Sequence, residues 1–519
     1  MSTEVIQVQE AVTRAESVRQ RLANSAWGTG TSAFVAHGVP FSFTTGPALA
    51  ERVFELASFL AGEDGLTVYD LGAGTGYLTR HVVEALLAKD PSLAAACRFV
   101  ATDTSERMVE VMGDVFDGLP KEARGRVDVR VEDVLSPESG VEGPSILLMS
   151  YLIDAIPPQH AVAADDGIQE VLIETFLTAD AEVLDASVWP PRVLNGEALA
   201  DVLQSSPESL SPGAVLQVLP FLLEGAVEGD VIPGLQDQVV LPLMNTRPAF
   251  CAVLRDLVSR LSEESLILVT DFGYSGMNVP EGFEELMTEY GATTCYAVFF
   301  EEILEAASEG GGTCCLIPGS PGGTHTLGIY KGDRTDAFVA MFSEVFEKEA
   351  FQIELDQTTN LEDTLSVEEQ VRGRGLDRAS YSHLANLAHL SAKHGSNALS
   401  AEYAECCDRR YGLIAAPEQL LLGDLAMGRG DVDEALRWYT RAQETAPTYG
   451  SVHLKAAEVY LERNQVDAYA EAMRAYIRVT NEPVSAHVRW LCESGQVSVP
   501  EDVRVEFAQI CEDELGESM

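Results

Sequence analysis

The first 160 residues alternate between short apolar runs and longer stretches in which apolar residues recur every three or four positions. The short runs predict strands that are buried on both faces, and the longer stretches predict amphipathic helices. The expected strands are 67–71, 97–102, 127–131 and 145–150, and the expected helices between them are 75–89 and 105–115. This alternation predicts an α/β fold with a parallel sheet and crossover helices.

The segments around this core are less regular. Residues 5–23 predict a helix, and 47–60 predict a helix with proline in its first turn. Residues 160–260 interrupt the rhythm and predict a mixture of helix and loop. We interpret them as a cap inserted on the substrate side of the sheet, and a structural extension unrelated to substrate is the alternative.

The sheet resumes after this insertion. Residues 265–270 predict another buried strand. Residues 314–317 and 325–330 are separated by the turn-rich sequence Pro-Gly-Ser-Pro-Gly-Gly and predict an antiparallel closing pair.

The chain becomes helical from about residue 335, and a linker is expected at 358–374. Beyond it, small and large residues recur about every 34 residues. The middle copy contains Gly423, Gly430, Ala435, Tyr439, Ala442 and Pro447, the next contains Ala457, Asn464, Tyr469, Met473, Tyr476 and Asn481, and an earlier, weaker copy contains Ala388, Gly395, Ala404 and Cys407. The period resembles that of tetratricopeptide repeats, whose helix pairs need neighbours to bury their faces. We therefore expect a sheet domain at 1–335, helix and linker at 336–374, and helical repeats at 375–519.

Length and composition favour an intracellular protein. A chain of 519 residues is long enough for two or three domains. No apolar run reaches the roughly 18 residues of a membrane span, and the N-terminus lacks the apolar core of a signal peptide. The nine cysteines include no C-x-x-C pair, so we expect reduced thiols, a soluble cytoplasmic protein and no metal site.

The charge is unusual, with 82 acidic against 34 basic residues and a formal net charge of −48. Such a field repels nucleic-acid phosphates and anionic membranes, so we expect neither as a partner. It would attract basic peptides or proteins. Adaptation of the surface to a salty cytoplasm explains the same composition equally well.

A glycine-rich turn follows the first predicted strand, in the stretch Val68-Tyr-Asp-Leu-Gly-Ala-Gly-Thr-Gly-Tyr-Leu78. Glycines at such a turn let the backbone approach a ligand closely. A dinucleotide fingerprint requires a glycine where Tyr77 stands. The Asp-x-Gly-x-Gly-x-Gly spacing instead resembles motif I of class I S-adenosylmethionine (SAM)-dependent methyltransferases. That resemblance implies Asp70 near the amino-acid end of SAM, and Gly72, Gly74 and Gly76 under its methionine and ribose. A plain strand-to-helix turn is the alternative.

Polar residues follow the other predicted strands, and the carboxyl ends of parallel strands meet at one edge of the sheet. Asp103 is placed to accept hydrogen bonds from both ribose hydroxyls, as carboxylates at this position do in doubly wound folds. Asp133 is placed to accept from the adenine amino group. Each acid alone is equally well explained as a solvated loop residue. Their order behind the glycine turn favours a cofactor site.

Four short stretches occur in the order found in the MidA-like family. They are Phe43-Thr-Thr-Gly-Pro-Ala-Leu49, Asp70-Leu-Gly-Ala-Gly-Thr-Gly76, Leu152-Ile-Asp-Ala-Ile-Pro157 and Val269-Thr-Asp-Phe-Gly273. The chain resembles that family over about residues 15–335. The family includes mitochondrial methyltransferases that help to assemble respiratory complex I by methylating a protein arginine. The resemblance implies that Thr44 and Thr45 lie over SAM and that Asp154 faces the methyl acceptor.

One departure from the family concerns the acceptor. The family has Asn-Glu where this chain has Ser150-Tyr151, so a glutamate that would pair with a guanidinium is missing. We assign Ser150 to the cofactor side. Asp154 and Tyr151 are the catalytic candidates, the first to orient a cationic acceptor or take its proton and the second to stack on a planar acceptor.

Three further residues near this segment are weaker candidates. His160 is the nearest imidazole, although a lone loop histidine is more often solvated. Asp271 and Tyr274 are expected to flank the same rim.

Together these features imply a Rossmann-like class I methyltransferase sheet with an inserted cap, followed by an all-α repeat domain. The leading hypothesis is a SAM-dependent methyltransferase acting on a protein or peptide side chain, of basic character given the charge. The repeats would dock the substrate or a partner, or mediate self-association. A small-molecule methyltransferase and a non-catalytic SAM-binding scaffold are the alternatives.

Overall fold

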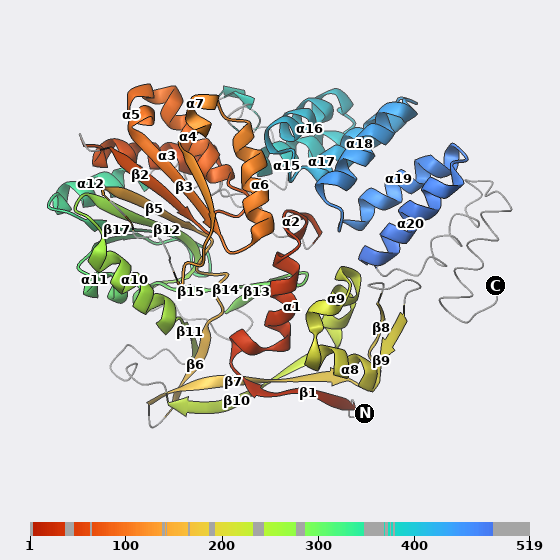
Figure 1. Cartoon of the computed structure of the whole chain (residues 1–519), viewed down its shortest axis with the longest axis horizontal. Helices are drawn as coiled ribbons and strands as arrows, with labels where there is room; N and C mark the ends of the chain where they lie inside the picture. The colour runs from red at the N-terminus through yellow and green to blue at the C-terminus, as the bar shows by residue number, and fades with distance from the viewer. Residues whose placement is uncertain are drawn as a thin grey trace.

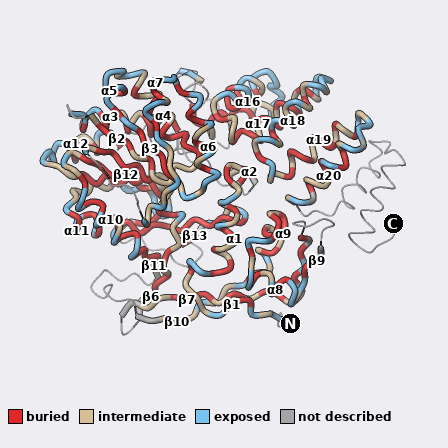
Figure 2. The backbone as a smooth tube through the Cα atoms, viewed as in Figure 1, coloured by how far each residue is buried: buried red, intermediate tan, exposed pale blue. Residues whose placement is uncertain are grey.

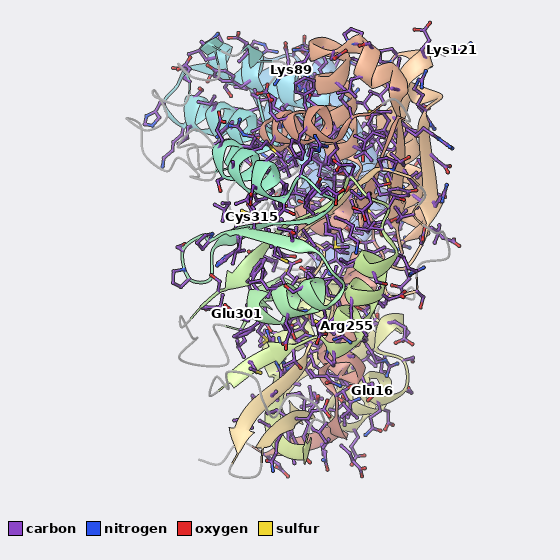
Figure 3. All side chains as sticks on the ribbon, turned by 90° about the vertical axis from the view of Figure 1, so that its left-hand side faces the viewer. Glu16, Lys89, Lys121, Arg255, Glu301 and Cys315 are labelled. Carbon is purple, nitrogen blue, oxygen red and sulfur yellow. The ribbon has the colours of Figure 1, made fainter. Side chains whose placement is uncertain are left out.

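The computed structural model describes residues 4–36, 46–62, 65–136, 141, 143–164, 167–185, 192–231, 243–276, 286–346, 368, 372–373, 375–376 and 379–480. Three regions are visible in Figure 1: a central sheet flanked by helices, an antiparallel sheet at one end, and a row of helix pairs beside the central sheet. In the side view, Lys89 and Lys121 lie at the opposite end of the molecule from Glu16, which belongs to the antiparallel region (Figure 3).

The central sheet has the strand order β16-β17-β12-β5-β2-β3-β4, with β15 paired to β12. Neighbouring strands from β12 to β4 are parallel, and β17 and β16 close one edge antiparallel. The strands are β2 (Leu66–Leu71), β3 (Cys97–Asp103), β4 (Val127–Val131), β5 (Ser145–Ser150), β12 (Ser265–Tyr274), β15 (Val298–Phe299), β16 (Thr313–Ile317) and β17 (Thr324–Lys331). This mostly parallel sheet confirms the Rossmann-like α/β prediction.

Helices cover both faces of this sheet, which explains its apolar strands. Along β5, Ile146 and Leu148 join the core under α3 and α4, whereas Leu147 and Met149 join the core under α10 and α11. Successive strand residues point to opposite faces, so a strand covered on both sides must be apolar throughout. The helices are α3 (Pro47–Leu60), α4 (Tyr77–Lys89), α5 (Pro91–Ala96), α6 (Glu106–Asp117), α7 (Lys121–Arg124), α10 (Pro248–Arg260), α11 (Phe300–Glu309) and α12 (Thr335–Phe346).

The antiparallel sheet corrects two predictions. The helix expected at 5–23 is wrong, because residues 5–12 form a strand that pairs with β7 and the helix begins only at Val18. Residues 160–246 also contain strands where helix and loop were expected. The elements are β1 (Val5–Val12), α1 (Val18–Trp27), β6 (Gln159–Ala164), β7 (Gly167–Thr178), β8 (Glu182–Asp185), β9 (Arg192–Asn195), α8 (Gly196–Ser205), α9 (Pro212–Val218), β10 (Leu222–Val231) and β11 (Leu243–Thr246).

Period-two burial explains these strands. In β7, Val171, Ile173 and Leu177 are buried, whereas Leu172 and Glu174 between them are partly exposed. Helix α10, although inside the predicted insertion, packs with α11 on the central sheet. The insertion therefore ends with β11 at Thr246, and the chain returns to the central sheet with α10.

Three helix pairs lie within residues 381–480. They are α15 (Tyr381–Lys393) with α16 (Asn397–Tyr411), α17 (Ala416–Gly428) with α18 (Val432–Thr445), and α19 (Gly450–Glu462) with α20 (Val466–Thr480). The residues Gly395, Gly430 and Asn464, between the two helices of each pair, all have positive φ. In the middle pair, a Cβ on Gly423 would lie 2.2 Å from the Tyr439 ring, so glycine is required there.

The helix pairs share a core with the sheet region. One cluster of buried side chains extends from Val68 of β2 through Val82 of α4 to Leu387 and Tyr411 of the helix pairs. Figure 2 shows buried residues in red both in α4 of the sheet region and in α16 and α17 of the helix pairs. Helix α20 also packs against α9, and Val35 of α2 (Ser32–Ala36) contacts the core of the second and third pairs.

A membrane span requires a long helix that is apolar throughout. None of the helices in the described part of the chain has both the length and the apolar character needed to cross a bilayer.

Candidate functional site

The glycine turn connects β2 to α4 in a left-handed backbone conformation. Gly72, Gly74 and Gly76 have φ values of 66°, 55° and 78°. Side chains with a Cβ rarely adopt this region, which explains why all three positions are glycine. Gly76 is also the residue immediately before α4, so the unpaired amide groups of the helix start lie at the turn.

The three glycines differ in what surrounds them. A Cβ on Gly72 would lie 2.5 Å from Leu152, and a Cβ on Gly76 would lie 2.9 Å from Met112 and Phe116. A Cβ on Gly74 would meet nothing within 4 Å. Packing inside the protein therefore requires the outer two glycines, whereas the middle glycine faces open space. The structure thus leaves room for a ligand beside Gly74.

Asp103 lies directly beside this turn. Its Oδ2 accepts a hydrogen bond from the Gly74 amide at 3.0 Å, and its Oδ1 accepts from the Ser105 amide at 2.9 Å. Burial raises the pKa of Asp103 above its ordinary value. The structure therefore brings together Gly74 and Asp103, which the sequence assigned to one cofactor. Each carboxylate oxygen keeps a further lone pair for a hydroxyl group.

Asp70 lies beneath the turn. The side chain is buried in the end of β2, and Oδ2 accepts a hydrogen bond from Thr79 Oγ1 of α4 at 2.7 Å. Burial raises the pKa of Asp70 to about 6. Asp70 therefore ties α4 to β2 and supports the glycine turn from below.

We expect the stability difference between Asp70→Asn and the wild type to depend on pH. The folded-state pKa of Asp70 lies above its unfolded value, so this carboxyl loses stabilising free energy as the pH rises through the window between them. The amide in the variant does not titrate, so the variant does not lose this free energy. The unfolding free energy of the variant minus that of the wild type should therefore increase by about 1 to 2 kcal/mol between about pH 5 and about pH 8.

Thermal and urea denaturation at the two pH values would measure this difference. Asp114→Asn, at an exposed position of α6, is the matched control and should show a flat difference. A flat difference for Asp70→Asn as well would show that its carboxyl titrates normally.

The end of β5 carries Ser150 and Tyr151. Ser150 Oγ is buried and has no hydrogen-bond partner among the described residues. Tyr151 has a φ of 50°, an unusual conformation for an aromatic residue, and its hydroxyl is 2.7 Å from Thr324 Oγ1 of β17. Strained residues of this kind occur often at functional sites. A buried hydroxyl without a partner fits a position that a cofactor completes.

The remaining cofactor candidates are more peripheral. Asp133 follows β4, is exposed, and accepts a hydrogen bond from the Leu135 amide at 2.9 Å. It lies at the carboxyl end of the strand next to β3, as expected. Thr44 and Thr45 lie outside the described residues.

Asp154 and Asp271 lie behind the end of β5. Asp271 Oδ2 accepts from the amides of Ile153 and Asp154 at 2.9 and 3.2 Å. Asp271 is fully buried and shapes this turn, so its expected position on the rim is corrected. Asp154 is 2% exposed, its Oδ1 has no hydrogen-bond partner among the described residues, and burial raises its pKa to about 6.

The two weaker candidates are also structural. His160 is buried in β6, where Nε2 accepts from Arg14 Nε at 3.1 Å and Nδ1 is 2.7 Å from Asn245 Oδ1. Burial lowers its pKa to about 3, so it stays neutral. Tyr274 is buried and stacks on Phe299 with ring centroids 5.9 Å apart. The prediction that His160 is a solvated loop residue is therefore wrong, and so is the rim position of Tyr274.

Three residues that support the site were not identified from the sequence. Thr79 and Thr324 are the hydroxyl partners of Asp70 and Tyr151. Arg247 is buried beside Asp154 and donates to the carbonyl groups of Tyr296, Ala297 and Ile156. A basic residue directly before Pro248 at the start of an amphipathic helix was the only available signal. Within the described part of the chain, no group of three or more His, Cys, Asp or Glu side chains could hold a metal ion.

The parallel sheet, the left-handed glycine turn and the adjacent carboxylate of Asp103 fit a site for a nucleotide-containing cofactor at the carboxyl ends of the strands. Residues 48–290, just under half of the chain, match the family model described as "Putative S-adenosyl-L-methionine-dependent methyltransferase". The matched range includes the glycine turn, Asp103 and the end of β5. The enzyme is a methyltransferase, and its cofactor is SAM.

Solved structures resemble the chain at low identity. An uncharacterized superfamily protein from Burkholderia thailandensis is 12% identical to this chain. Its TM-score is 0.42, and the match covers 62% of this chain and 88% of that chain. A member of the same superfamily from that organism, bound to S-adenosyl-homocysteine, is 12% identical, with a TM-score of 0.40 over 59% and 73%. The CcbJ methyltransferase from Streptomyces caelestis is 9% identical, with a TM-score of 0.30 over 59% and 98%. No curated protein matches the sequence.

Proposed function

We propose that the enzyme methylates a side chain of a protein or peptide and that its helix pairs dock this substrate or a partner. The observation that carries the proposal is the shared core of the helix pairs and the sheet region. The helix pairs pack directly against α4, the helix that begins at the glycine turn. A protein bound to them would therefore lie close to the proposed cofactor site.

On the cofactor side, we assign SAM to the carboxyl ends of β2, β3, β4 and β5. Gly72, Gly74 and Gly76 form the turn against which it lies, Asp103 accepts from the ribose, and Asp133 accepts from the adenine. Ser150 would contact SAM from below, and Thr44 and Thr45 would contact it from above. Asp70 supports the turn through Thr79.

Methyl transfer requires mainly that donor and acceptor be held in line. When bound, SAM supplies an electrophilic methyl group on a sulfonium, and orientation can contribute roughly 7 to 11 kcal/mol to lowering the barrier. The proposed residues are therefore binding and orienting groups. Tyr151 is the proposed contact with the acceptor, held through Thr324. The carboxylate of Asp154 is buried behind Tyr151, close to Arg247, and we propose that it acts through the position of Tyr151.

The distribution of charge supports a basic substrate. The helix pairs, residues 379–480, contain 13 acidic and 10 basic residues, whereas residues 1–346 contain 51 acidic and 18 basic residues. Adaptation to salt would acidify both regions, since both have exposed surfaces. If the charge serves to steer a basic substrate toward the sheet region, the excess of acidic residues should lie outside the helix pairs, as it does.

The proposal also includes the type of the helix pairs and the family that the order of the motifs indicates. We assign the helix pairs to the tetratricopeptide type, because Gly395, Gly430 and Asn464 recur with positive φ and Gly423 accommodates Tyr439. We place the chain with MidA-like methyltransferases on the order of its motifs, with Ser150-Tyr151 replacing Asn-Glu. Action in a reducing cytoplasm fits the free cysteines of the described residues.

Transfer of label from methyl-labelled SAM tests the function. We expect label in lysine-rich or arginine-rich peptides and little in acidic peptides of matched length, because the acidic region repels the latter. Tyr151→Phe should reduce this turnover about tenfold and leave the affinity for SAM unchanged, since it removes only the proposed acceptor-side hydroxyl. The measurements are scintillation counting and calorimetric titration with S-adenosylhomocysteine.

The alternatives predict different outcomes of the same assay. Label found in small metabolites but in no peptide would favour a small-molecule methyltransferase. Tight binding of S-adenosylhomocysteine with no transfer to either substrate class would favour a scaffold.

A further inference from the structure

Helix α4 begins at the glycine turn, and contacts on three sides fix its orientation. On the side of the sheet, Thr79 Oγ1 donates to Asp70 of β2. At its start, Met112 and Phe116 of α6 pack so closely on Gly76 that no Cβ fits. The third side faces the helix pairs. The position of α4, and with it the turn, therefore depends on both regions of the protein.

The contact with the helix pairs is a closed aromatic cluster. Tyr77 and His81 lie one turn apart on α4, and their ring centroids lie 5.1 and 5.7 Å from that of Tyr411, the last residue of α16. The three side chains are 1–3% exposed. His81 Nε2 is 3.2 Å from the Tyr411 hydroxyl, which itself donates to the carbonyl of Ala379 at 2.9 Å. His81 is therefore the donor to Tyr411.

A charged group completes the cluster. Arg410 Nη2 lies 3.4 Å from His81 Nδ1 and 3.5 Å from Glu84 Oε2 of α4. With the proton on Nε2, Nδ1 of His81 can accept from the guanidinium, and Glu84 Oε2 lies 3.4 Å from the same nitrogen, so His81, Glu84 and Arg410 form one polar group. Two successive residues of α16 thus hold one face of α4 by directional bonds, in addition to packing.

We propose that the helix pairs are a structural part of the cofactor site, in which Tyr411 and Arg410 position α4 and thereby set the affinity of the glycine turn for SAM. The amide groups at the start of a helix move with the helix as a rigid unit, so their alignment with a ligand depends on what holds its first two turns. Tyr77 and His81 are in those turns. A partner that displaces α16 would change SAM affinity through the same contact. The inference rests on the proposed placement of SAM at the glycine turn.

Tyr411→Phe in the full-length chain tests the inference, because it keeps the ring and removes the acceptor of His81. The variant also removes the bond to the Ala379 carbonyl, but only the bond to His81 holds α4. We therefore expect the Kd for S-adenosylhomocysteine, measured by calorimetry, to rise roughly three- to tenfold, the effect of one buried hydrogen bond. Tyr381→Phe is the matched control. Its ring packs edge-on against Tyr411, but its hydroxyl bonds Glu418 within the helix pairs, so the Kd should be unchanged.

A second variant makes the test independent of one residue. Arg410→Met should weaken binding in the same direction, and it serves as the test if Tyr411→Phe does not fold. A wild-type Kd in the folded variant would overturn the inference, even if its melting temperature falls as in the control. Gly74→Asp is measured alongside, because unchanged binding by that variant would show instead that SAM binds elsewhere.

Discussion

Gly74→Asp is expected to abolish the binding of S-adenosylhomocysteine and to leave the fold intact. A Cβ at this position meets nothing within 4 Å, and aspartate tolerates a left-handed φ better than most residues. The new carboxylate would occupy the space proposed for the ligand and would lie next to the carboxylate of Asp103, which bonds the same backbone amide. Lost contacts and like-charge repulsion together should weaken binding by at least about 100-fold.

A control variant separates this effect from backbone strain. Gly430, between α17 and α18, also has a positive φ of 78°, and a Cβ there would likewise meet nothing within 4 Å. Gly430→Asp should therefore cost similar stability and leave binding unchanged. Calorimetric titration and thermal unfolding of the two variants are the measurements. Wild-type affinity in folded Gly74→Asp would mean that the glycine turn is only a strand-to-helix connection.

The fold of the central sheet could be predicted because each strand is buried on two faces. Apolar runs such as those of β2 and β5 leave little ambiguity, and the glycine turn marks where a helix must begin. The N-terminal strand β1 could not be predicted in the same way. Its partner β7 lies more than 150 residues away in the chain, and this pairing overrides the local helical pattern of residues 5–12.

In the candidate site, too, some residues could be predicted from the sequence and others could not. Gly74 and Asp103 could be predicted because both follow strand ends, and parallel strands bring those ends together. The orientation of a side chain at a strand end cannot be deduced from its position in the sequence. Asp271 therefore looked like a rim residue and His160 like a solvated loop residue, although Asp271 bonds backbone amides and His160 bonds Arg14 and Asn245.

The helix pairs illustrate a further limit. Their period is visible in the sequence, because Gly395 and Gly430 recur in the turns. Their position relative to the sheet is not visible in the sequence, because the contact between Tyr411 and His81 joins residues 330 positions apart. Deleting the helix pairs would uncover Tyr77 and His81, so a loss of activity after such a deletion would not isolate substrate docking. Point variants on exposed faces of the pairs are the appropriate test.

Arg247→Met is expected to cause the largest loss of stability. The Arg247 side chain is 2% exposed and donates to three carbonyl groups, those of Ile156, Ala297 and Tyr296, near the junction of the two sheets. Asp154 and Asp271 lie near it, and burial raises the pKa of both above the ordinary value. Glu302 accepts from the Arg247 amide, and burial raises its pKa to about 7. Methionine has a similar length, so the variant removes mainly the charge and the donors.

The variant removes a positive charge from among buried carboxylates and removes the donor to three carbonyl groups, so we expect a loss of about 3 to 5 kcal/mol at about pH 8. Arg255→Met on the same helix is the control. Arg255 is half-exposed and pairs with half-exposed Glu309, so its loss should cost less than about 1 kcal/mol. Urea denaturation of the three proteins measures both effects.

The pH dependence identifies the cause of the loss. Arg247 lowers the pKa of Asp154, Asp271 and Glu302, although burial still leaves each above its ordinary value. In Arg247→Met the three folded-state pKa values should rise further from their unfolded values. A folded carboxyl with a raised pKa is stabilised as the pH falls, so the variant should recover part of its deficit between about pH 8 and about pH 6. If the deficit in unfolding free energy does not change with pH, the loss comes from the carbonyl hydrogen bonds alone. Arg247 would then act by bonding the backbone and not as a counter-charge for the buried acids behind Tyr151.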